Sequence, residues 1–126
     1  MDQEGNKTIL IVEDDDSVRT LEKDFLKKRG YEILEAATAK DGINLALSEN
    51  PDLILMDVRL PNKKRGIGAA RIIRNNEKTK GVPIIFVTAY EKGNYTKEIT
   101  NIPNCAYITK PFEVGELLKL IKEFIG

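Results

Sequence analysis

Leu53-Ile54-Leu55-Met56-Asp57 is the stretch that decides the fold, since four apolar residues lead directly into an aspartate. A second apolar stretch, Ile9-Leu10-Ile11-Val12, ends the same way, in the acidic residues 13–16. Short apolar runs bounded by polar residues are typical of strands buried on both faces of a parallel sheet. Chemistry in such sheets gathers at the carboxyl ends of the strands, so the two runs predict one acidic pocket. Carboxylates held so close together need a cation or shared protons.

Strand and helix patterns alternate along the rest of the chain. Five strands are expected, over residues 9–12, 31–36, 53–56, 84–87 and 106–108. Helices are expected after each of them, over about residues 16–29, 39–49, 66–75, 91–102 and 114–125. Alternation without an internal repeat or a linker predicts an α/β fold, a doubly wound parallel sheet in a three-layer arrangement. Residues 1–126 then form a single domain, with 1–7 as a loose lead-in.

Apolar spacing predicts which side of each helix faces the sheet. In the first helix, Asp15 or Asp16 is the expected N-cap, and Thr38 with Asp41 approximates a capping box for the second. The segment 91–102 has the weakest helix pattern. The apolar residues expected to face inward are Val18, Leu21, Phe25 and Leu26 in the first helix, Ile67, Ala70 and Ile73 in the third, and Ile99 and Ile102 in the fourth.

Composition excludes several classes of function. Lys+Arg and Asp+Glu both number 20, so no net charge favours nucleic acid or a membrane surface. The chain has no histidine, which rules out imidazole bases and ligands, and its single cysteine cannot form an internal disulfide. No apolar run approaches the ~20 residues of a membrane span, and the first residues lack the pattern of a secretory signal. A cytoplasmic domain without direct nucleic-acid binding is expected.

Acidic residues at the two strand ends point to a metal site. Glu13, Asp14 and Asp57 offer hard oxygen ligands with no nitrogen or sulfur donor in the motif, a set that suits Mg²⁺. A carboxylate beside such a metal can attack a phosphoryl group. Thr88 and Lys110 end the fourth and fifth expected strands, where a hydroxyl and an ammonium can contact phosphoryl oxygens.

Four motifs together resemble the receiver domain of two-component response regulators, and they span nearly the whole chain in the right order. Each motif alone is short and weak, so the resemblance depends on the complete set. The motifs are Ile11-Val12-Glu13-Asp14-Asp15, Leu55-Met56-Asp57-Val58-Arg59-Leu60-Pro61, Val87-Thr88-Ala89 and Thr109-Lys110-Pro111-Phe112.

The resemblance implies a flavodoxin-like strand order, 2-1-3-4-5, and a signalling function. Asp57 would accept a phosphoryl group from a histidine kinase or a histidine phosphotransfer protein. Asp14 would bind Mg²⁺ directly, Glu13 directly or through water, and the backbone carbonyl of Arg59 would add a further ligand. The domain would catalyse its own phosphorylation and dephosphorylation without being a conventional enzyme.

The resemblance also implies a switch. Thr88 and Lys110 match the family's phosphoryl-binding hydroxyl and lysine, and Lys110-Pro111 matches a cis peptide bond. Phosphorylation would draw the Thr88 hydroxyl inward and let the Tyr107 ring rotate, the alternative being an ordinary half-buried strand tyrosine. The surface formed by segment 91–102, the fifth strand and the last helix would then change its shape. An unknown downstream protein would bind the changed surface.

Two departures from the family pattern concern phosphoryl lifetime. Lys63, Lys64 and Arg65 form a basic segment where the family often has an uncharged or acidic loop. A solvated loop is the favoured interpretation, and the alternative hypothesis is that these cations influence phosphorylation or dephosphorylation rates. Arg59 and Tyr90 each lie two residues after a motif residue, where they would shield the acyl phosphate and slow its hydrolysis.

Three alternatives fit parts of the pattern. A flavodoxin-like FMN binder needs a phosphate loop rich in hydroxyls and amides, where this chain has acids. A haloacid-dehalogenase-type phosphatase needs a second acid two residues after Asp57, where this chain has Arg59. A receiver-like protein-binding module that is not phosphorylated is the remaining alternative, and the complete set of acids with Thr88 and Lys110 argues against it.

Overall fold

The protein folds as a five-stranded parallel sheet in the order β2-β1-β3-β4-β5. The computed structural model describes residues 6–58, 65–88, 99 and 101–126. The strands are β1 (Thr8–Val12), β2 (Glu32–Ala36), β3 (Leu53–Asp57), β4 (Ile84–Thr88) and β5 (Cys105–Thr109). The predicted α/β class and strand order are therefore confirmed.

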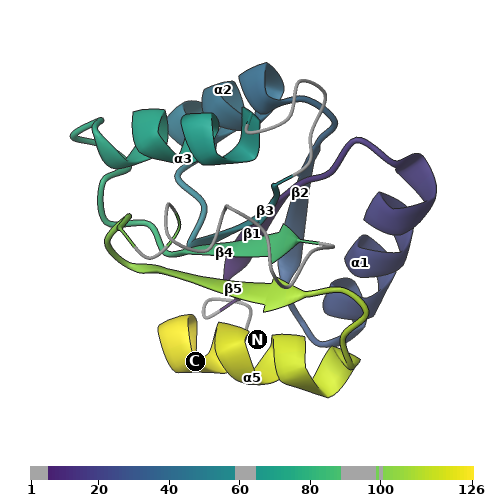
Figure 1. Cartoon of the computed structure of the whole chain (residues 1–126). Helices are drawn as coiled ribbons and strands as arrows, with labels where there is room; N and C mark the ends of the chain where they lie inside the picture. The colour runs from purple at the N-terminus through teal and green to yellow at the C-terminus, as the bar shows by residue number, and fades with distance from the viewer. Residues whose placement is uncertain (1–5, 59–64, 89–98, 100) are drawn as a thin grey trace.

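Helices cover both faces of the sheet, which gives the three layers (Figure 1). Helices α2 and α3 lie on one face and α1 and α5 on the other. Of the helix predicted over 91–102, only residues 99, 101 and 102 are described, and Ile99 and Ile102 are buried as expected. The bounds are α1 (Asp16–Lys28), α2 (Ala39–Glu49), α3 (Arg65–Arg74) and α5 (Val114–Ile125).

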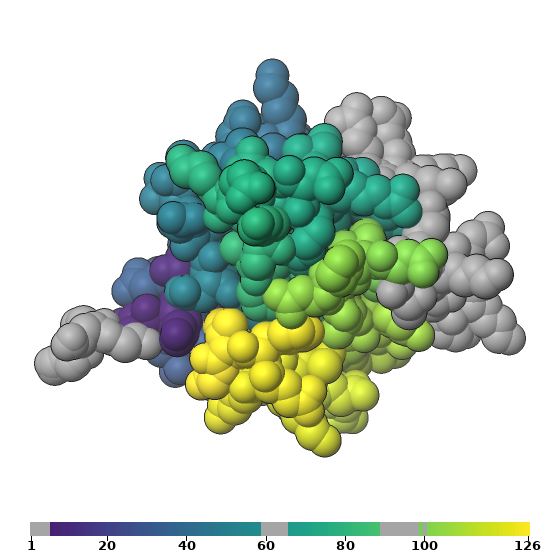
Figure 2. Space-filling model, turned by 90° about the vertical axis from the view of Figure 1, so that its left-hand side faces the viewer, coloured from purple at the N-terminus to yellow at the C-terminus, as the bar shows by residue number. Residues whose placement is uncertain are grey.

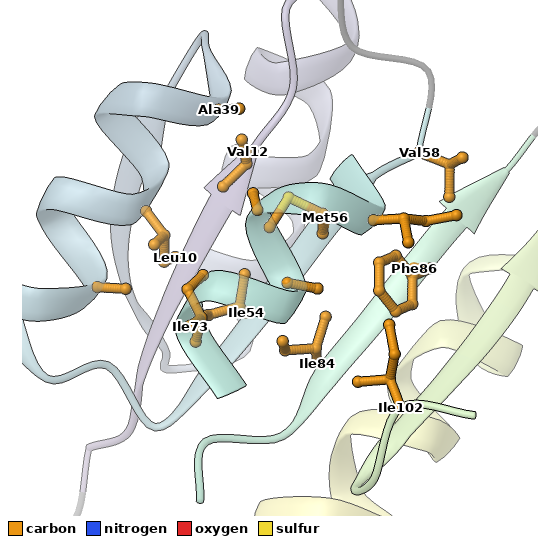
Figure 3. Close-up of a cluster of buried hydrophobic side chains, with 14 of the residues drawn as sticks. Leu10, Val12, Ala39, Ile54, Met56, Val58, Ile73, Ile84, Phe86 and Ile102 are labelled. Carbon is orange, nitrogen blue, oxygen red and sulfur yellow. The ribbon is translucent and has the colours of Figure 1, made fainter. Parts of the chain in front are cut away.

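Two apolar cores follow from the alternation of side chains along the buried strands. Leu10, Ile54 and Phe86 point toward α2 and α3 and pack in the cluster that Figure 3 shows. Ile9 and Leu55 point the other way, into the cluster beneath α1 and α5. Every residue of β3 and β4 is buried, which explains their continuous apolar sequence.

Helix starts match the capping signals in the sequence. The Asp15 side chain accepts a hydrogen bond from the Val18 N–H at 3.0 Å, so Asp15 is the N-cap of α1. The Thr38 hydroxyl accepts one from the Asp41 N–H, also at 3.0 Å. Both bonds satisfy amide groups that the first turn of a helix leaves without partners.

The prediction for Leu21 is wrong. Its side chain is 70% exposed, while the next residue of α1, Glu22, is half-buried. Leu26 marks the buried centre of α1. Leu21 lies about 140° around the helix from Leu26 at ~100° per residue, whereas Glu22 lies only about 40° from it. The prediction relied on the apolar character of Leu21, although its position around the helix places it away from Leu26.

Arg74 ties the turn after α3 to the chain that enters β5. Its guanidinium donates to the carbonyls of Lys80 at 2.8 Å and Pro103 at 2.9 Å. In the space-filling view, the teal α3 lies above the green segment leading into β5, with the yellow α5 below (Figure 2). Nearby, the buried hydroxyl of Thr79 donates to the Ile73 carbonyl at 2.6 Å. These bonds fix the edge of the sheet opposite the acidic strand ends.

Candidate metal and phosphoryl site

Strand register places the acidic ends of β1 and β3 side by side. Val12 pairs with Met56, so the next residue along each strand, Glu13 and Asp57, reaches the same level of the sheet. Alternation from Ile11 and Leu55 directs both side chains toward the α1 and α5 face. The acidic side chains at the two strand ends therefore lie close together, as the sequence predicts.

Three carboxylates converge at this edge. One oxygen from each of Glu13, Asp14 and Asp57 lies within 4.8 Å of the other two. Glu13 and Asp57 are buried, with 3% and 7% of their surface exposed, while Asp14 is exposed to solvent. A cluster of oxygen ligands that is open on one side can hold a divalent cation that keeps several waters, as Mg²⁺ does.

Glu13 has the most perturbed environment of the cluster. Burial, above all, raises the pKa of its carboxyl to about 7, and the nearby Asp57 charge adds to the effect. The Asp15 N–H donates to its Oε2 at 3.0 Å and acts in the opposite direction, as does the Lys110 ammonium. A cation that binds this carboxylate must compete with its proton, because a metal ligand has to be deprotonated.

Lys110 and Thr88 reach the same edge from β5 and β4. The Lys110 ammonium lies 3.8 Å from Glu13 Oε1. The Lys110 N–H donates to the Thr88 carbonyl at 2.7 Å, which binds the ends of the two strands together, and Thr88 itself is buried. The Lys110–Pro111 peptide bond is cis, as expected.

Other predicted residues lie apart from this cluster or outside the described residues. Tyr107 is on β5 with 39% of its surface exposed. Arg59, Tyr90 and the loop residues Lys63 and Lys64 lie outside the described ranges, as does the side chain of Arg65. Their predicted roles stay predictions.

Three residues outside the sequence motifs border the site. A Cβ atom on Gly66, the second residue of α3, would lie 2.3 Å from the Asp57 carbonyl oxygen. The Arg19 guanidinium donates to the Glu13 carbonyl at 2.7 Å. Burial raises the pKa of Glu22 to about 7, helped by the charge of Glu13. The sequence signals that could have indicated two of them were a glycine at the expected start of the third helix, Gly66, and an arginine one turn into the first helix, Arg19.

The fold and site together define an α/β domain with a carboxylate cluster at the carboxyl edge of its sheet, an arrangement that can hold a divalent cation. The response regulator receiver domain model matches residues 9–122, and the chain belongs to this family. Members of the family are signalling modules of two-component systems rather than conventional enzymes. No helix in the described part of the chain has the length and apolar character needed to cross a bilayer.

Several known proteins are similar to this chain over nearly its full length. The polar-differentiation response regulator DivK of Brucella ovis is 32% identical over 120 residues, covering 95% of this chain and 97% of its own. The receiver domain of the sensor histidine kinase PA1611 from Pseudomonas aeruginosa, solved with magnesium in its active-site cleft, is 32% identical with a TM-score of 0.87 and coverages of 96% and 98%. A CheY-like receiver domain protein from Methanospirillum hungatei is 34% identical, with a TM-score of 0.85 and coverages of 94% and 92%.

Proposed function

We propose that this domain is phosphorylated on Asp57 by the phosphohistidine of a histidine kinase or a histidine phosphotransfer protein. A carboxylate oxygen of Asp57 attacks phosphorus, and the P–N bond to the donor imidazole breaks. The bonding electron pair returns to the imidazole nitrogen, which takes up a proton from water. The observation that carries the proposal is the convergence of three carboxylates within 4.8 Å, with an ammonium 3.8 Å from one of them.

Glu13, Asp14 and Asp57 are the proposed Mg²⁺ ligands, and the backbone carbonyl of Arg59 is a further one implied by the family. The donor set fits the metal because it consists of carboxylate oxygens without nitrogen or sulfur. When bound, Mg²⁺ supplies positive charge that offsets the phosphoryl oxygens. With the cation bound, Glu13, Asp14 and Asp57 would no longer repel one another, and the Asp57 oxygen would be held in place for attack.

Lys110 and Thr88 are proposed to hold the phosphoryl group. Lys110 is already drawn to the carboxylate edge by Glu13, and a phosphoryl oxygen on Asp57 would offer it a stronger acceptor. The Thr88 hydroxyl would donate to a second oxygen from the neighbouring strand. Phosphoryl transfer requires mainly such positioning and charge neutralisation, which explains how a chain without histidine catalyses its own phosphorylation and dephosphorylation.

The output proposal concerns Tyr107. Movement of Thr88 toward the phosphoryl group would free space for the Tyr107 ring, which starts from an exposed position on β5. The surface formed by segment 91–102, β5 and α5 would then present a different shape to a downstream protein. A cytoplasmic location and a single domain over residues 1–126 complete the proposal.

Incubation with Mg²⁺ and acetyl phosphate, followed by intact mass measurement, tests the proposal. We expect a single phosphoryl adduct that requires Mg²⁺ and is absent in Asp57→Asn. Asp24→Asn is the matched control, because Asp24 is exposed on α1 and outside the acid cluster. Continuous phosphate release without an adduct would favour a phosphatase. Absence of any adduct, while the protein remains folded, would favour the alternative of a binding module that is not phosphorylated.

A further inference from the structure

Arg19 connects three elements behind the acidic cluster. Its Nη1 donates to the Glu13 carbonyl at 2.7 Å, and its Nε donates to Glu35 on β2 at 3.2 Å. Its Nη2 pairs with Asp16 in the first turn of α1. The Arg19 side chain is only 16% exposed, and its bond to the Glu13 carbonyl is the most buried of the three, whereas the Asp16 side chain is 86% exposed. A guanidinium fork is suited to such a junction because its donors point in fixed directions.

The bond to the Glu13 carbonyl fixes the backbone that carries two of the three acids. The Glu13 N–H donates to the Ala36 carbonyl at 3.0 Å, so both peptide groups around Glu13 are anchored. The Glu13 carbonyl shares a planar peptide group with the nitrogen of Asp14. Fixing that plane therefore sets where the Asp14 side chain leaves the backbone.

Asp14 depends on this backbone more than its neighbours do. The Glu13 carboxylate accepts a hydrogen bond from the Asp15 N–H, but within residues 6–58, 65–88, 99 and 101–126 no hydrogen bond holds the carboxylate of Asp14. Repulsion from Glu13 and Asp57 favours its movement away from the cluster. The position of the Asp14 oxygen is thus set through its own main chain.

We infer that Arg19 is a positioning residue for the cation site: through the Glu13 carbonyl it holds Asp14 where the three carboxylates can share one Mg²⁺. The inference rests on the proposed function, in which these acids bind Mg²⁺. Partners that orient metal ligands commonly contribute about 10-fold or more to metal affinity. This effect opposes simple electrostatics, because removing a nearby positive charge should by itself strengthen cation binding.

The opposite signs make the test decisive. Arg19→Met removes the charge and the bond to the Glu13 carbonyl. Lys23→Met is the matched control, since Lys23 contributes an equal charge to the same network through Glu35, at 3.2 Å, without contacting Glu13 in the described structure. The Mg²⁺ affinity of the folded proteins is measured by NMR titration of backbone amides near Asp57. Chemical denaturation of each variant reports its stability separately.

We expect Arg19→Met to weaken Mg²⁺ binding about tenfold and Lys23→Met to leave it unchanged or slightly stronger. Phosphorylation by acetyl phosphate in Arg19→Met should need more Mg²⁺ but recover at saturating Mg²⁺. Arg19→Lys, which keeps the charge with a shorter reach, should weaken binding by a smaller factor, and it provides the same test if Arg19→Met does not fold.

Unchanged or tighter Mg²⁺ binding in the folded Arg19 variants overturns the inference, as does equal weakening in Lys23→Met. A wild-type protein that binds Mg²⁺ but forms no phosphoryl adduct refutes the proposed phosphorylation and leaves the Arg19 result standing. A wild-type protein that binds no Mg²⁺ refutes both.

Discussion

Replacement of Gly66 by alanine should damage the site although Gly66 itself carries no functional group. The added Cβ would lie 2.3 Å from the Asp57 carbonyl oxygen and 3.0 Å from the Val58 Cα. Both neighbours are backbone atoms that immediately border the proposed phosphoryl acceptor. They cannot swing away as the end of a flexible side chain can, so either α3 or the end of β3 must move.

The size of the effect follows from these distances. Reaching a separation of 3.0 Å, the closest that real Cβ atoms show, requires a shift of 0.7 Å, the difference from 2.3 Å. Overpacking of a rigid core costs about 1–3 kcal/mol, against which alanine in a helix gains about 0.5–1 kcal/mol over glycine. We therefore expect a net loss of about 1–2 kcal/mol in the free energy of unfolding. Displacement of the nucleophile by nearly 1 Å should slow phosphorylation by about 10–100-fold.

Gly68→Ala is the matched control, because it makes the same change two residues further along α3. A Cβ at Gly68 meets nothing within 4 Å, so this variant should gain about 0.5–1 kcal/mol from the better helix former. Urea denaturation gives the stabilities, and acetyl phosphate labelling at saturating Mg²⁺ gives the rates. The reasoning is refuted if Gly66→Ala matches Gly68→Ala in stability and labels as fast as the wild type.

Three further predictions concern the pH dependence of stability, the effect of Mg²⁺ on the melting temperature, and one buried hydrogen bond. The raised pKa of Glu13 means that the folded, Mg²⁺-free protein binds a proton more tightly than the unfolded chain; this contribution is complete below the usual value of 4.5 and lost as pH rises through about 7. Denaturation of the Mg²⁺-free protein should therefore show the free energy of unfolding falling by a few kcal/mol as the pH rises through that range, at about 1.4 kcal/mol per unit of pKa shift. A free energy of unfolding that does not change with pH would contradict the role of burial. Mg²⁺ should raise the melting temperature with a slope set by mass action, and the increase should vanish with EDTA or in Asp57→Asn. Thr79→Val should lower stability by about 1–3 kcal/mol in thermal melts, because the Ile73 carbonyl loses the donor that now lies at 2.6 Å; equal melting temperatures would show that this carbonyl finds another donor.

The acidic strand ends show how far the sequence alone leads. Apolar runs over 9–12 and 53–56 are local signals, and burial on both faces follows from their composition, as β1 and β3 confirm. The sequence predicted the start of α1 at Asp15 or Asp16 and that of α2 at Thr38, because capping involves neighbours only three residues apart, and the structure selects Asp15 for α1. The strand order was predicted from the family resemblance that the four short motifs carry together, since no single apolar run indicates which strands are neighbours.

Contacts between elements were decided by the tertiary structure. The side of α1 that packs on the sheet is the one that carries Leu26, so Glu22 rather than Leu21 turns inward. The approach of Gly66 to the Asp57 carbonyl depends on how closely α3 crosses the end of β3.

The sequence by itself therefore determined which residue types end the strands and, through their resemblance to a family, what chemistry to expect of Asp57. Only the tertiary structure brought Lys110 to 3.8 Å from Glu13 and Arg19 to 3.2 Å from Glu35. The physical reason is range: helix and strand periodicity acts over a few residues. Ion pairs and backbone contacts join segments whose separation is fixed only when the two cores pack.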